Sequence, residues 1–328
     1  MVPLVTTGNQ PLTTENLHLD DIVVPFQIEG IGVRGRATRL SGLITDVMSR
    51  HDYPEPVSIL LGEALTLVAM LGTALKFDGK LTLQTKTDGP VSMLVADFET
   101  PGKIRGYAHL DSERLTDALE QGIKAPTELL GTGYLALTID QGADMDRYQG
   151  IVQLDARGLT EAAHEYFAQS EQIATRIRMA VGPLYERGES GEASKVTWRA
   201  GAVMVQHLAE DGGLTGYREP EDERLLTDEE KNWEHAAILL DSVTDTELLD
   251  PDVTADRLLF RLYHEDGVRV FSPAGVQFGC PCSRERIEGV LKTFGADDLD
   301  HMVENGRIEA KCEFCADQYE FDPADLRG

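Results

Sequence analysis

The sequence has few basic residues and very few cysteines. Its 30 Lys and Arg residues stand against 57 Asp and Glu residues, which gives a formal net charge of −27. Binding to nucleic acid depends on clustered Lys and Arg side chains that neutralise phosphates, so this imbalance argues against nucleic acid as the main partner. The large negative charge is instead typical of a soluble protein that resists aggregation.

Long hydrophobic runs and a secretory signal are also missing. No apolar run reaches the length of a transmembrane helix. The first residues, MVPLVTTGNQPLTTEN, contain neither the basic segment nor the apolar segment of a signal peptide. We therefore expect a cytoplasmic protein that does not associate with membranes, and permanent disulfides are not expected in that compartment.

Motifs of common enzyme classes are absent as well. The sequence has no Walker A motif, no glycine-rich dinucleotide fingerprint after a predicted strand and no His-Glu-x-x-His. The carboxylates form no distinctive pair, and the eight histidines are scattered along the chain. We predict no catalytic residue and no enzymatic activity.

A hydrophobic content of 41% over 328 residues predicts a substantial core, enough for one large domain and a smaller one. Apolar residues recur at helical spacing from Val57 to Leu75, which predicts a long buried helix. Pro25 suggests that the first strand lies at a sheet edge. Alternation predicts strands at 22–28, 33–40, 80–87, 91–98, 103–110, 133–140, 149–154, 173–181 and 196–208, with further helices at 40–48, 111–124 and 159–170. This order of elements predicts an α+β fold with antiparallel sheets.

The composition changes near residue 210. The stretch Tyr217–Glu230 holds seven acidic residues and two basic ones, as in a solvated segment. Amphipathic helical patterns follow between 228 and 265, and short helices of this kind need a surface to dock on. We predict three parts, namely an N-terminal α+β domain at 1–209, an acidic helical linker at 210–272 and a small C-terminal module at 273–328.

All four cysteines lie in the predicted C-terminal module. Cys280 and Cys282 form a Cys-Pro-Cys pair, and Cys312 and Cys315 form Cys-Glu-Phe-Cys. Each short spacing lets two sulfurs face one point, and a tetrahedral zinc ion takes four thiolates. We therefore predict one zinc ion per chain held by these four cysteines, rather than free buried thiols or two permanent disulfides.

The module around the cysteines is too small to fold on an apolar core alone. A helix after Ser283, a second helix ending at Asn305-Gly306 and two strands at 307–311 and 318–321 are expected. Zinc should therefore supply much of the folding free energy. Zinc-bound cysteine is a thiolate, the form that oxidants attack. The spacing leaves open whether the zinc is a permanent staple or a centre that loses its metal on oxidation, and for a generic site of this kind the staple is favoured.

Several segments of the sequence together resemble those of one known protein family. The most specific are CPCSRERI at 280–287 and CEFC at 312–315. Others are VRGRATRL at 33–40, YQGIV at 148–152, FAQSEQI at 167–173, GAVMVQHL at 201–208 and FRLYHE at 260–265. With these segments the chain resembles, over most of its length, the redox-regulated heat-shock chaperone family of thirty-three kilodaltons.

The resemblance implies a holdase that needs no ATP and binds unfolding client proteins. It implies that the four cysteines hold zinc in a reduced, inactive form. Hypochlorite, or peroxide with heat, would then form the disulfides Cys280–Cys282 and Cys312–Cys315, release the zinc and unfold the linker, and the active form would be a homodimer. Two features depart from the family's usual pattern: Pro281 lies inside the first pair, and the linker is unusually acidic.

Two other functions fit parts of the sequence. A zinc ribbon that reads nucleic acid requires a basic face, which the net charge of −27 opposes. A thiol–disulfide oxidoreductase using Cys312 and Cys315 requires a thioredoxin-like βαβ setting, which the predicted elements do not suggest.

Overall fold

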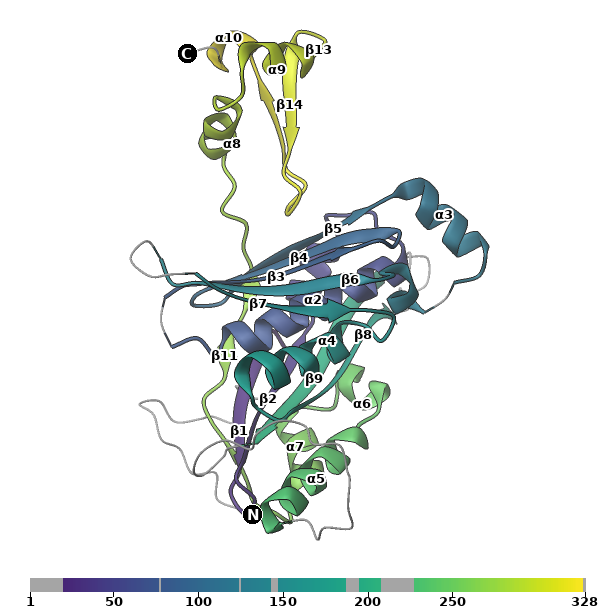
Figure 1. Ribbon diagram of the computed structural model, residues 1–328, viewed down its shortest axis with the longest axis vertical. Helices are drawn as coiled ribbons and strands as arrows, with labels where there is room; N and C mark the ends of the chain where they lie inside the picture. Colours follow the sequence, from purple (N-terminus) through teal and green to yellow (C-terminus); the bar gives the residue numbers. More distant parts are fainter. Residues whose placement is uncertain are drawn as a thin grey trace.

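Two large sheets form the body of the protein. The computed structural model describes residues 20–76, 78–123, 125–142, 147–186, 195–207 and 227–326. Within these ranges the chain forms two six-stranded sheets and a three-stranded sheet, with helices packed on or between them. Figure 1 shows the two large sheets one above the other, and the small sheet apart from them at the end of an extended segment. The predicted α+β class is confirmed.

The first sheet has the strand order β10-β1-β2-β9-β8, and β11 also pairs with β1. All of its pairs are antiparallel. Its strands are β1 (Ile22–Ile28), β2 (Val33–Leu40), β8 (Thr175–Glu186), β9 (Lys195–His207), β10 (Val268–Val270) and β11 (Ala274–Gly275). β1, β2 and β9 match the sequence prediction within one residue. β8 extends five residues beyond its predicted end at 181, and β10 and β11 were not predicted.

The prediction that Pro25 places β1 at an edge is wrong. β1 pairs with β2 along its whole length, and its other side is covered by β10 and β11. Pro25 lies between these two short strands, where the Phe271 amide donates to its carbonyl at 2.9 Å. Proline has no N–H to donate, so a gap between two partner strands accommodates it without the loss of a ladder hydrogen bond.

The second sheet has the order β12-β5-β4-β3-β6-β7. Its strands are β3 (Lys80–Thr87), β4 (Val91–Glu99), β5 (Lys103–Leu110), β6 (Gly133–Asp140), β7 (Tyr148–Leu154) and β12 (Gln277–Phe278). β12 runs parallel to β5, and the other pairs are antiparallel. Residues 274–278, which the sequence analysis placed in the C-terminal module, therefore extend both large sheets.

The predicted central helix is α2 (Glu55–Gly72), which lies between the two sheets (Figure 1). Its length of 18 residues and mean hydropathy of 1.5 are those of a membrane-spanning helix, which corrects the expectation that no apolar segment is long enough. However, 72% of it is buried inside the protein, as in a core helix. The other helical segments of the N-terminal part are α1 (Gly42–Met48), α3 (Ser112–Glu120), a 3₁₀ turn η2 (Pro126–Leu129), α4 (Leu159–Tyr166) and a π-helical turn η3 (Phe167–Glu171).

The linker helices cover the opposite face of the first sheet (Figure 1). They are α5 (Asp228–Asp241), α6 (Asp245–Leu249) and α7 (Ala255–Tyr263). Tyr263 is fully buried, stacks on Phe26 with ring centroids 6.0 Å apart, and donates its hydroxyl to the Ala236 carbonyl at 3.2 Å. The sequence prediction of docked amphipathic helices is confirmed, although it missed α6. The predicted boundary at 209–210 and the acidic residues 217–226 lie outside the described residues.

Basic side chains of the sheet hold the acidic linker. Arg176 forms two hydrogen bonds to Asp241, both 2.8 Å long. Arg178 binds Asp245 at 2.7 Å and the Val243 carbonyl at 3.0 Å. The linker helices are therefore held on the first sheet by ion pairs as well as by apolar contacts.

The C-terminal module contains α8 (Arg284–Leu291), α9 (Ala296–His301), β13 (Val303–Glu304), β14 (Arg307–Lys311), β15 (Gln318–Phe321) and α10 (Pro323–Leu326). Ser283 caps α8 as predicted, because its side chain accepts from the Arg286 amide at 3.3 Å. The second predicted helix is shorter than expected and ends at His301. Asn305 and Gly306, with φ of 52° and 79°, instead form the hairpin turn between β13 and β14.

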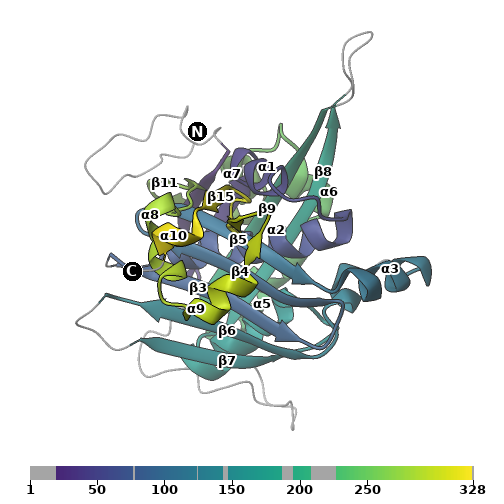
Figure 2. The same cartoon turned by 90° about the horizontal axis from the view of Figure 1, so that it is seen from above.

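The apolar core of this module is small. It consists of Leu291, Leu299, Ile308, Phe321 and Leu326, with a few half-buried neighbours. Figure 2 shows the module above the second sheet, and Figure 1 shows the single extended segment that leads up to it. A core of this size cannot offset the conformational entropy of so many residues without a further cross-link.

Candidate metal centre

Two separate backbone segments present the cysteines. Cys280 and Cys282 lie in the extended segment between β12 and α8, and Cys312 and Cys315 lie in the turn between β14 and β15. In that turn the Cys312 amide donates to Asp317 at 2.9 Å and its carbonyl accepts from Ala316 at 2.8 Å. These bonds fix a tight loop that turns both sulfurs toward the first pair.

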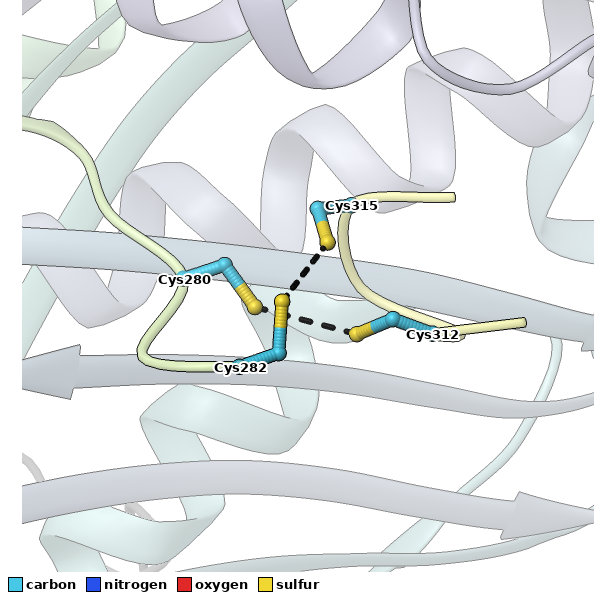
Figure 3. A group of neighbouring side chains, drawn as sticks. All are labelled: Cys280, Cys282, Cys312 and Cys315. Atoms are coloured by element: carbon cyan, nitrogen blue, oxygen red, sulfur yellow. Dashed lines mark hydrogen bonds between the residues drawn. The ribbon is translucent and has the colours of Figure 1, made fainter. Parts of the chain in front are cut away.

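The four sulfurs converge on one point (Figure 3). All of them lie within 4.8 Å of one another, with Cys280 and Cys312 at 3.8 Å and Cys282 and Cys315 at 3.1 Å. A tetrahedral zinc ion with Zn–S bonds of about 2.3 Å separates its ligand sulfurs by about 3.8 Å. The donor set and its spacing therefore fit a four-thiolate zinc site. Within the described part of the chain, no histidine or carboxylate belongs to this cluster.

The two pairs differ in exposure. Cys312 and Cys315 are buried, with 8% and 4% of their surface exposed, whereas Cys280 and Cys282 are half-buried. The cluster is thus closed on the side of the β14–β15 turn and reachable from the side of the Cys-Pro-Cys segment.

The electrostatic surroundings separate the thiols. Burial opposes ionisation of Cys280, but the Cys282 amide and the Arg105 guanidinium, 3.7 Å from the sulfur, together lower its pKa. Burial raises the pKa of Cys282 and of Cys315, and the Cys280 sulfur adds to the effect at both. At Cys282 the hydrogen bonds with the Tyr319 hydroxyl and the Cys315 sulfur oppose it. Four thiolates cannot share this volume without a cation, and a divalent cation at the centre favours all four.

Arg105 belongs to a polar network on the outer face of the second sheet. Asp97, only 3% exposed, accepts from Arg105 at 2.9 Å and from Thr82 at 2.7 Å, and it forms an ion pair with Lys80 at 2.9 Å. These bonds hold the guanidinium in place on β5. The cluster is therefore in contact with a fixed cation of the N-terminal domain.

Phe314 docks the cysteine turn on the same strand. Its ring centroid lies 3.8 Å from the Arg105 guanidinium, and Tyr107 meets it edge-on with centroids 4.8 Å apart. The Phe314 carbonyl accepts from His51 Nε2 at 3.3 Å, and the His51 ring stacks on Tyr53. One of the two residues between the cysteines, Phe314, thus carries this contact between the module and the large domain.

Sequence reasoning identified the four cysteines and missed their surroundings. In the sequence Phe314 is only a spacer in Cys-Glu-Phe-Cys, and Arg105 is one polar residue of an alternating strand. Tyr319, whose hydroxyl donates to the Cys282 sulfur at 3.3 Å, was also not predicted. One feature of the sequence could have identified Phe314: it is an aromatic residue in a metal-binding turn, a position where exposed polar residues are expected.

The structure does not give Cys312 and Cys315 the setting of an oxidoreductase. Such enzymes place a Cys-x-x-Cys pair near a βαβ unit. Here the pair occupies the turn of a β-hairpin, between β14 and β15.

The fold and the site together define a class of protein. It is a two-sheet α+β protein in which a helical segment leads to a C-terminal module with four converging cysteines that could hold a metal ion. A family model described as Hsp33 protein matches residues 21–322. The chain therefore belongs to the Hsp33 family, as its sequence motifs indicated.

Known proteins resemble the chain over nearly its whole length. It is 42% identical to the 33 kDa chaperonin of Caulobacter vibrioides, covering 93% of this chain and 96% of that protein. It is 35% identical to the 33 kDa chaperonin of Azotobacter vinelandii, covering 93% of each. The crystal structure of the Thermotoga maritima 33 kDa chaperonin superposes with a TM-score of 0.72 at 22% identity, covering 93% of this chain and 96% of that one. This last similarity concerns the fold.

Proposed function

We propose that the protein is a redox-regulated holdase chaperone that needs no ATP. In the reduced, resting state Cys280, Cys282, Cys312 and Cys315 hold one zinc ion. The observation that carries the proposal is the docking of a four-sulfur cluster on the large domain through Phe314 and Arg105. Membership of a family whose relatives are named 33 kDa chaperonin supports the chaperone role.

The bound zinc would stabilise the module, which has too small a core to fold alone. Structural zinc contributes an apparent ~10–16 kcal/mol to the folding of small modules, comparable with the ~5–15 kcal/mol stability of a whole domain. Each disulfide forms when a pair of cysteine thiolates gives up two electrons. Hypochlorite accepts these electrons, takes two protons from the solvent, and becomes chloride and water. Disulfide formation at Cys280–Cys282 and Cys312–Cys315 removes the ligands, and the module loses its main support.

Loss of order in the module reaches the linker through the chain. The segment that carries Cys280 continues back through β12 and β11 to β10 and α7. When α5, α6 and α7 leave the first sheet, an apolar surface that includes Phe26, Val203 and Tyr263 becomes available to unfolding client proteins. The acidic side chains of the linker keep the exposed form soluble.

The same proposal covers the remaining partners. The active, oxidised form is a homodimer that holds clients in the cytoplasm. Nucleic acid and membranes are not partners, and the protein is not an enzyme.

Zinc content and client aggregation, measured on one sample before and after hypochlorite, test the proposal. The reduced protein should contain one zinc per chain and leave aggregation unchanged. The oxidised protein should have released the zinc and suppress aggregation without ATP, and dithiothreitol should reverse the change. Equal suppression by both forms, or suppression by a form that retains its zinc, would contradict it. Catalytic turnover of a disulfide substrate would support the oxidoreductase instead.

A further inference from the structure

A cavity of about 150 Å³ lies within the N-terminal domain. It is bounded by the C-terminal end of α2, by α4 and η3, and by β2, β9, β3 and β6 from the two sheets (Figure 1). None of the residues around the cysteine cluster lines it. Its walls are mainly apolar and include Leu71, Leu81, Leu137, Ile139, Phe167 and Met204.

Arg36 is a charged residue in this apolar wall. Its Nε atom is buried and has no hydrogen-bond partner, and no hydrogen bond or ion pair joins its side chain to any residue in the described part of the chain. Burial, together with nearby Arg34, lowers the pKa of the guanidinium from its ordinary value. The side chain is half-buried, so the terminal nitrogens of the guanidinium are open to solvent and can receive an anion.

The other polar groups at the cavity are already occupied. Gln206 donates to Thr175 at 3.2 Å, and the exposed Glu171 accepts from the Tyr166 hydroxyl at 3.1 Å. Glu171 does not pair with Arg36. The site therefore offers a ligand one free cation and an apolar space.

Size and charge together define the ligand. The cavity of about 150 Å³ is open to solvent on one side, so an apolar group about the size of benzene can lie inside it while the rest of the ligand extends through the opening. A carboxylate pairs with a guanidinium through two parallel hydrogen bonds, which adds geometric specificity to the charge. We propose that this cavity binds a small amphiphilic carboxylate, with its chain or ring among the leucines and its head group on Arg36.

Octanoate is a suitable probe, and 1-octanol is its uncharged counterpart. Both are titrated into the reduced, zinc-loaded full chain with methyl-labelled methionine, where Met204 reports from the cavity wall. Octanoate should shift the Met204 signal until the site is saturated. It should bind at least about tenfold more tightly than octanol, since a hydrogen bond to a charged group strengthens binding by about this factor. No saturable shift, or equal affinity for the two probes, overturns the proposal.

Three variants assign the effect to residues. Arg36→Met should weaken octanoate about tenfold or more and leave octanol unchanged. Arg34→Met, an exposed neighbour on the same strand, should change neither. Ala74→Leu, which fills the cavity, should weaken both probes. If folded Arg36→Met binds octanoate with wild-type affinity, the assignment to Arg36 is overturned. If Arg36→Met does not fold, Arg36→Lys replaces it, and this variant should still bind octanoate more tightly than octanol.

Discussion

The Arg105 guanidinium lies over the ring of Phe314, 3.8 Å from its centroid, and also points at the Cys280 sulfur from 3.7 Å. One side chain of the large domain thus touches both cysteine-bearing segments. Because Asp97 holds Arg105 from beneath, the module is docked against a fixed point. Several predictions about switching depend on this contact.

Phe314→Ala should loosen the docking of the module without removing a cysteine. The cation–π contact and the edge contact with Tyr107 each contribute about 0.5–1.5 kcal/mol. A combined loss of about 1–3 kcal/mol raises the undocked fraction by a factor of about 5 to 150. Peroxide should therefore oxidise the cysteines faster, as measured by alkylation and mass spectrometry.

Phe294→Ala is the matched control, since Phe294 is an aromatic residue of the same module with 42% of its surface exposed. It should leave the oxidation rate close to that of the wild type. Equal acceleration by both variants would show that Phe314 acts only through the stability of the module.

Cys280→Ser should lower zinc affinity by at least about tenfold, because even residues outside the ligand shell change metal affinity by 10–100-fold. Cys280→His should retain more zinc than Cys280→Ser, since three cysteines and one histidine also form a stable zinc shell. Zinc release to a chromogenic chelator measures both. Full retention of zinc by Cys280→Ser would remove this residue from the ligand set.

A double variant with glutamine at both Arg176 and Arg178 should have a larger fraction of molecules in which the linker helices are detached from the first sheet. Both residues are partly exposed, so each pair contributes about 1 kcal/mol or less. Amide exchange in α5 and α6 should accelerate several-fold, and high salt should produce a similar effect in the wild type.

Arg147→Gln is the control for the linker experiment. It removes an exposed ion pair with Asp140, 2.8 Å long, that involves no linker residue. Its exchange pattern in α5 and α6 should match the wild type. Unchanged exchange in the double variant would show that the apolar contacts alone hold the linker.

The disulfide Cys312–Cys315 should form before Cys280–Cys282. A disulfide needs Cα atoms about 4.4–6.8 Å apart and a dihedral near 90°. Two residues separate Cys312 from Cys315, whereas only Pro281 separates the other pair, and its fixed φ makes closure strained. Mass spectrometry during a slow peroxide titration gives the order.

The structure makes the outcome of that titration informative. Cys280 has the lowered pKa, and the sulfurs of Cys282 and Cys315 are 3.1 Å apart. First appearance of Cys280–Cys282 would contradict the strain argument. A cross-link between Cys282 and Cys315 would replace the proposed pairing altogether.

Glu63 on α2 should make stability depend on pH. Burial raises the pKa of its carboxyl from 4.5 to about 7 in the folded state. The folded protein therefore holds a proton that the unfolded chain releases above pH 4.5, so stability falls as pH rises from about 4.5 to about 7. The complete loss is at most about 3 kcal/mol.

Glu63→Gln should remove this dependence. In thermal unfolding, the Glu63→Gln variant should have a higher melting temperature than the wild type at pH 8 and nearly the same melting temperature at pH 4.5. Glu120→Gln, at an exposed position on α3, should show no such difference. A parallel pH profile for wild type and Glu63→Gln would contradict the assignment.

Elements with a long local pattern could be predicted from the sequence. The apolar repeat from Val57 to Leu75 predicted α2, and the two cysteine spacings predicted the cluster, because both signals lie within short stretches. α6 has only five residues, yet the Thr244–Glu247 capping box marked its start and could have identified it.

Other features depend on partners that are distant in the chain. β10 and β12 have three and two residues, too few for any periodicity, and they form because Phe26 pairs with Val270 and Ile104 with Phe278. The contact between Arg105 and Phe314 likewise exists only once the sheet and the hairpin are placed. No local pattern in either segment encodes it.

The two short strands at 274–278 have a consequence for client recognition. Two backbone hydrogen bonds hold β12 beside β5: the Gln277 amide donates to the Gly102 carbonyl at 2.9 Å, and the Gly279 amide donates to the Ile104 carbonyl at 3.0 Å. β11 pairs with the edge of β1. If the proposed switch frees this segment, the amides and carbonyls that it covers on β1 and β5 become unpaired, and such edges are templates for strand addition. Such edges recognise the main chain, which all polypeptides share, so one chaperone can hold clients with unrelated side chains.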